Sequence, residues 1–65
     1  MKWSGQRELM REIFAASNGD EVRIVREYSA AERDGKVLRK ENKSDKSPEE
    51  YARALLADGL KKRWL

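Results

Sequence analysis

Apolar side chains recur at helical spacing near the start of the chain. They fall at i, i+1, i+4 and i+5, which places them on one face of an α-helix: Leu9, Met10, Ile13 and Phe14. Asn18 and Gly19 follow, and both residue types tolerate the left-handed backbone conformation in which helices often end. The pattern predicts a helix from about residue 4 to residue 17.

The next segment allows two structures. Asp20 is a suitable N-cap for a helix over about 21–34, which Gly35 would end. Five apolar residues gather within about half of that helix's circumference: Val22, Ile24, Val25, Tyr28 and Ala31. The alternative is a β-hairpin, because several of these residues are β-branched and residues 36–39 could pair back on them. Strict alternation fails at Val25, so the helix is favoured.

Residues 35–46 have a different character. Val37 and Leu38 are their only large apolar residues, and we expect them to reach the core as a short extended piece. The segment holds five basic and two acidic side chains, a local charge of +3. It is predicted to be a solvated basic connecting loop.

The last third of the chain has the strongest helix signals. Ser47 and Glu50 have the spacing of a capping box, and Pro48 suits the first helical position. A four-residue series forms the predicted apolar stripe: Ala52, Leu56, Leu60 and Trp64. Because this series crosses Gly59, we expect the helix to continue through the glycine, at a cost of about 1 kcal/mol relative to alanine.

These patterns predict an all-α fold in which three helices form a single small domain over residues 1–65. An α+β fold, with a short hairpin at about 21–42 between two helices, is the alternative. Sixty-five residues allow one domain at most. The chain has no cysteine and no histidine, which excludes a disulfide framework and disfavours a zinc site. No cofactor or metal is therefore expected.

Catalysis is also disfavoured. Without histidine and cysteine the usual bases and nucleophiles are missing, and the four glycines are too scattered to form a phosphate-binding loop. We expect a protein that is not an enzyme and has no evident small-molecule ligand. No signal-peptide pattern or membrane-length apolar run is visible, so the expected location is cytoplasmic, without membrane association.

Binding remains as the expected role. The C-terminal helix ends in an aromatic and basic cluster, which favours association with a protein partner or a second copy of the chain. The candidate residues there are Lys61, Lys62, Arg63, Trp64 and Leu65. The alternative is a nucleic-acid-binding module, in which the Lys61–Arg63 cluster contacts phosphates together with the loop. The loop candidates are Arg39, Lys40, Lys43 and Lys46.

Overall fold

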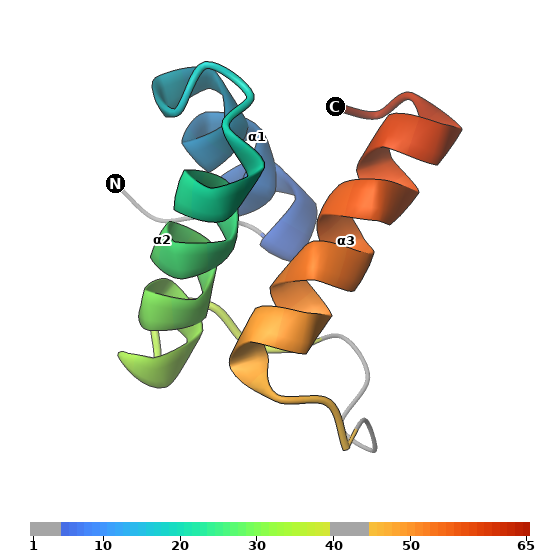
Figure 1. Cartoon of the computed structure of the whole chain (residues 1–65). Coiled ribbons are helices and arrows are strands. Elements are labelled where there is room, and N and C mark those ends of the chain that lie inside the picture. The colour runs from blue at the N-terminus through green and yellow to red at the C-terminus, as the bar shows by residue number, and fades with distance from the viewer. Residues whose placement is uncertain (1–4, 40–44) are drawn as a thin grey trace.

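The computed structural model describes residues 5–39 and 45–65 (Figure 1). Within them the chain forms three α-helices: α1 (Gln6–Ala16), α2 (Glu21–Arg33) and α3 (Pro48–Lys62). The described residues contain no β-strand, and α2 occupies most of the segment proposed for the hairpin. The predicted all-α, three-helix fold is therefore confirmed, and the hairpin alternative is wrong for residues 21–39.

α1 forms because its apolar residues share one side. Leu9, Met10 and Ile13 are buried. The helix ends at the expected place, where Asn18 and Gly19 take positive φ angles of 53° and 77°. This left-handed pair reverses the chain, because glycine and asparagine adopt such angles with little steric cost.

α2 begins with the predicted cap. The Asp20 carboxylate accepts a hydrogen bond from the Val22 amide at 3.1 Å. Ile24, Val25 and Tyr28 point into the core as expected, whereas 68% of Val22 is exposed. Val22 lies at the edge of the apolar arc, so the prediction that it joins the core was wrong.

α3 begins with the predicted capping box. The Glu50 amide donates to the Ser47 hydroxyl at 3.3 Å, and the Ser47 amide donates to the Glu50 carboxylate at 3.1 Å. The helix continues through Gly59 to Lys62, also as expected. α3 packs mainly against α2, and the two helices run in opposite directions (Figure 1).

The core lies between the three helices. Its apolar members come from every helix and from the connection after α2: Leu9, Met10, Ile13, Ile24, Val25, Tyr28, Val37, Ala52, Leu55 and Leu56. Val37 reaches the core as predicted, but 82% of Leu38 is exposed, since the chain bends at Val37 and only that side chain is buried. The same core leaves Leu60 55% exposed, which corrects the predicted stripe.

Candidate functional site

The chain end folds back on α3. Arg63 takes a left-handed conformation with φ 61°, and the amides of Trp64 and Leu65 donate to the Gly59 carbonyl at 3.1 and 3.3 Å. A Cβ on Gly59 would lie 2.6 Å from the Leu65 side chain. An alanine at this position would therefore require the Leu65 side chain to shift away from α3.

Trp64 is held in place from several directions. The Arg7 guanidinium lies 5.1 Å from the centre of its ring, and its indole N–H donates to Asp58 at 3.3 Å. Arg11 donates to the Trp64 carbonyl at 2.7 Å. Trp64 and Leu65, two of the predicted binding residues, are half-buried against the core and join α1 to the end of α3.

The three basic residues before Trp64 differ in their partners. Lys62 lies 3.2 Å from Asp58. The hydrogen bond from Trp64 and this lysine hold the pKa of the Asp58 carboxyl below its usual value. Lys61 and Arg63 are exposed and have no acidic partner within the described part of the chain.

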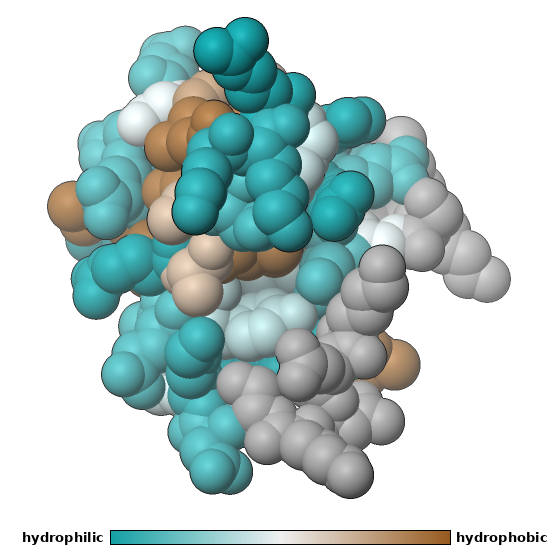
Figure 2. Space-filling view, turned by 90° about the vertical axis from the view of Figure 1, so that its right-hand side faces the viewer, coloured by the Kyte–Doolittle hydropathy of each residue, from teal (hydrophilic) through white to brown (hydrophobic). Residues whose placement is uncertain are grey.

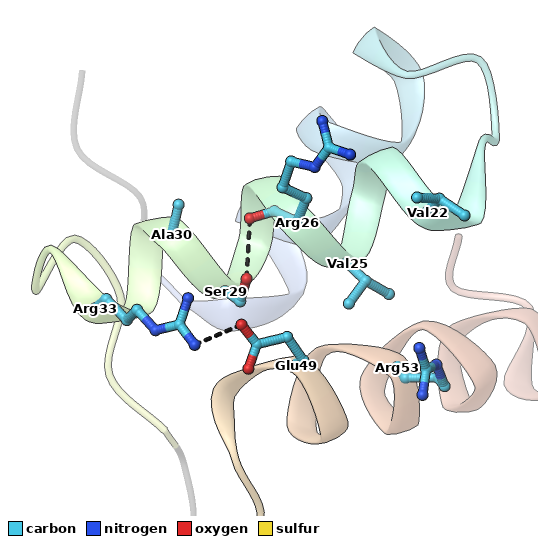
Figure 3. A pocket seen from close by; sticks show the side chains of 8 residues that line it. All are labelled: Val22, Val25, Arg26, Ser29, Ala30, Arg33, Glu49 and Arg53. Carbon is cyan, nitrogen blue, oxygen red and sulfur yellow. Dashed lines mark hydrogen bonds and ion pairs between the residues drawn. The ribbon is translucent and has the colours of Figure 1, made fainter.

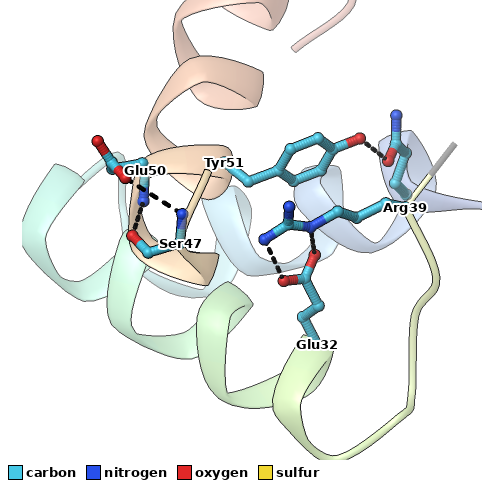
Figure 4. Close-up of polar contacts among 6 residues, drawn as sticks. Glu32, Arg39, Ser47, Glu50 and Tyr51 are labelled. Atoms are coloured by element: carbon cyan, nitrogen blue, oxygen red, sulfur yellow. Dashed lines mark hydrogen bonds and ion pairs between the residues drawn. The ribbon is translucent and has the colours of Figure 1, made fainter. Parts of the chain in front are cut away.

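Arg39 has a structural environment that its sequence context did not indicate. Its guanidinium donates to both carboxylate oxygens of Glu32, at 2.9 and 3.0 Å (Figure 4). It also lies 4.6 Å from the centre of the Tyr51 ring. Only 17% of the Arg39 side chain is exposed. Arg39 therefore ties the segment after α2 to both α2 and α3, and few of its donors face solvent.

The two predicted basic clusters are far apart where the structure describes them. Lys46 precedes α3, whereas Lys61, Lys62 and Arg63 end it (Figure 1). A helix of 15 residues is about 22 Å long, so these charges do not form one patch. Lys40 and Lys43 lie outside the described residues.

A different surface combines charge with apolar area. A groove with a volume of about 360 Å³ lies on the surface between α2 and α3 (Figure 3). It is lined by Val22, Val25, Arg26, Ser29, Ala30, Arg33, Glu49 and Arg53. Figure 3 shows Val25 and Ser29 pointing towards α3, while Arg26 and Ala30 stand on the outer rim of α2. The groove thus has a partly apolar floor and arginines along its edges.

The arginines of the groove are only weakly neutralised. Arg33 and Glu49 form an ion pair of 2.5 Å across it, with both side chains substantially exposed. Arg53 lies 3.8 Å from Glu21, a long and exposed contact. Arg26 has no acidic partner among residues 5–39 and 45–65. Exposed ion pairs contribute little to stability, so these arginines can exchange partners at small cost.

The structure describes three large apolar side chains as exposed: Val22, Leu38 and Leu60. Val22 lines the groove and Leu38 does not. The third, Leu60, follows Arg53 by seven residues and Glu49 by eleven, so it returns to within about 20° of both on α3. We name Val22, Val25, Arg26, Arg53 and Leu60 the α2–α3 face.

The side of the molecule that α3 occupies is mostly hydrophilic. The hydrophobic surface in this view lies mainly in its upper half, at the height where α3 ends (Figure 2).

Sequence reasoning missed the α2–α3 face because it assigned Val22 and Leu60 to the core. The spacing of Glu49, Arg53 and Leu60 was the available signal, since it places all three on one side of a helix.

Comparisons with known protein families, with curated proteins and with solved structures give no match. No helix in the described residues is long and apolar enough to cross a membrane. Those same residues contain no cluster of three acidic side chains arranged to hold a metal ion.

Proposed function

We propose that this chain is a small non-catalytic binding domain that associates with another polypeptide through the α2–α3 face. One observation carries the proposal: the exposed Val22 lines this arginine-edged groove, and the register of α3 places the exposed Leu60 on the same side of the helix as Arg53. The central part of a protein interface is more apolar than the rest of the surface, and arginine is enriched there. The C-terminal helix remains part of the proposed surface, through Arg53 and Leu60 rather than through Trp64.

Trp64 and Leu65 fit less well as the main contacts, because both are engaged within the fold. Arg7, Arg11 and Asp58 hold Trp64, and the Leu65 side chain covers Gly59. Their release would expose part of the core. We therefore assign them a supporting role, in which they fix the end of α3 and so the position of Leu60.

The nucleic-acid alternative requires its two basic clusters to act together. Lys46 and the Lys61–Arg63 cluster lie at opposite ends of α3, which weighs against a shared phosphate-binding surface.

The charge of the groove opposes association with a second copy of the chain. The groove is lined by three arginines and one glutamate, 3 − 1 = +2, so two copies would bring like charges together.

Peptide display tests the proposal. A random peptide library would be selected on the immobilised wild-type chain, and the affinities of the enriched peptides measured with purified variants. We expect the double change Val22→Gln with Leu60→Gln to weaken binding at least about tenfold, since two apolar contacts are lost.

Leu38→Gln is the matched control, because it also removes an exposed large apolar side chain but lies off the groove. It should leave binding unchanged. Equal losses for both variants, or a library in which no peptide is enriched, would show that the α2–α3 face is not the binding site.

A further inference from the structure

The groove also indicates what kind of polypeptide it accepts. We infer that its partner is an acidic amphipathic helix, which packs along the α2–α3 face with apolar anchors towards Val22 and Leu60 and carboxylates towards Arg26 and Arg53. This inference rests on the proposed function, and it adds the chemical class and the conformation of the partner.

The charge of the groove selects for carboxylates. Arg26 has no acidic partner within residues 5–39 and 45–65, and Arg53 has only the 3.8 Å contact to Glu21. Guanidinium groups bind carboxylates with two parallel hydrogen bonds, and a partner that supplied them would satisfy donors that now face water. A basic or neutral segment would leave those donors unpaired in the interface.

The register of Arg53 and Leu60 along α3 favours a helical partner. Val22 and Arg53 line the groove from α2 and α3, and Leu60 follows Arg53 by seven residues, about 10 Å further along α3. On a helical partner laid along this side of α3, residues seven positions apart would be separated by the same distance and share one face. Carboxylates between them, one turn from either anchor, would reach the arginine edges.

The groove itself is suited to a third helix. It is formed by two neighbouring antiparallel helices, and its floor carries short side chains such as Val25 and Ser29 (Figure 3). A helix laid in a groove of this kind buries its apolar face against both walls while its backbone hydrogen bonds stay internal. An extended peptide would need backbone partners that helix surfaces do not offer.

The test uses three synthetic peptides with one helical frame, each with two leucines two turns apart. The positions flanking the leucines hold glutamate in the first peptide, glutamine in the second and lysine in the third. Binding to the full chain would be measured by fluorescence anisotropy at low and high salt. We expect the glutamate peptide to bind about tenfold tighter than the glutamine peptide, and the lysine peptide more weakly still.

Variants then assign the contacts. Arg26→Gln and Arg53→Gln should each reduce the affinity of the glutamate peptide several-fold and leave that of the glutamine peptide unchanged. Lys36→Gln removes an equal charge from a residue that does not line the groove, and it should have little effect. Leu60→Gln should weaken both peptides.

Several results would overturn the inference. Equal affinities of the three peptides, with continued dependence on Leu60, would exclude an acidic partner while leaving the proposed function intact. Binding of display-selected peptides through the α2–α3 face, without binding of the glutamate peptide, would likewise exclude an acidic partner and leave the proposed function intact. Binding of a random DNA duplex that requires Arg26 and Arg53 but not Leu60 would replace both proposals with phosphate recognition. A dimer in sedimentation that Leu60→Gln abolishes would identify a second copy as the partner.

Discussion

Leu56 and Leu60 stand one helical turn apart in α3 and face opposite environments. Leu56 is 4% exposed and belongs to the core, whereas Leu60 is 55% exposed and continues the α2–α3 face. Four residues advance 400° around a helix, so each step of a four-residue series drifts by about 40°. The inward side of α3 stabilises the fold, and the outward side leaves apolar area that the fold does not use.

The largest effect should come from the inward leucine. Leu56→Ala is expected to cost about 2–5 kcal/mol, through lost apolar burial and a residual cavity. A domain of this size has a net stability of roughly 3–5 kcal/mol, so much of the variant should be unfolded. Leu60→Ala is the matched control and should change the free energy of unfolding by no more than about 0.5 kcal/mol. Urea denaturation followed by circular dichroism checks both, and similar losses for the two leucines would contradict the comparison.

Tyr28 places a polar group inside the core. It is 1% exposed, and its buried hydroxyl has no hydrogen-bond partner within the described residues. Burial raises the pKa of Tyr28 well above its usual value. Tyr28→Phe should therefore increase the free energy of unfolding by about 1 kcal/mol, since a desolvated polar group is removed.

Tyr51 supplies the control for that substitution. Its hydroxyl donates to the Gln6 side chain at 2.5 Å, so Tyr51→Phe should lower the free energy of unfolding by about 1 kcal/mol. Opposite signs for the two substitutions in urea denaturation would support the assignment. A loss of stability in Tyr28→Phe would mean that the hydroxyl is hydrogen-bonded after all.

The C-terminal turn should respond weakly to pH. The pKa of Asp58 is lowered first by the hydrogen bond from Trp64 and then by Lys62. A carboxylate with a depressed pKa stabilises the fold above its unfolded value of about 4, and this contribution is lost as the pH falls through the folded value. Thermal unfolding should separate the wild type from Asp58→Asn by at most a few degrees at neutral pH, and the difference should vanish in acid. A difference independent of pH would contradict the role of the Asp58 charge.

The smallest effect on stability is expected on the outward side. Val22→Gln and Leu60→Gln should each change the free energy of unfolding by no more than about 0.5 kcal/mol, because both side chains already face water. Urea denaturation of the double variant measures this. A large loss would show that the α2–α3 face belongs to the fold and is not free for a partner.

The helix starts were predictable because they depend on local chemistry. Asp20 caps α2, and Ser47 with Glu50 caps α3, as their spacing indicated. Asn18 and Gly19 likewise end α1 where the sequence placed its end. Each of these signals involves residues within a few positions of one another, so no tertiary information was needed.

The parts that were not predicted depend on distant contacts. Arg39 was assigned to a solvated loop, but Glu32 and Tyr51 enclose it once the helices pack. Arg63 adopts the left-handed conformation, which glycine usually occupies, and the turn it forms packs on Gly59. Leu60 was assigned to the core because a four-residue series was read as one straight stripe.

The most direct test of the α2–α3 face is an NMR titration of the isotope-labelled chain with the glutamate peptide. We expect the largest amide shift changes at Val22, Arg26, Arg53 and Leu60, with little change around Leu38 and on the exposed side of α1. Shift changes centred on Trp64 and α1, or spread evenly over the chain, would contradict the assignment of the binding site to this face.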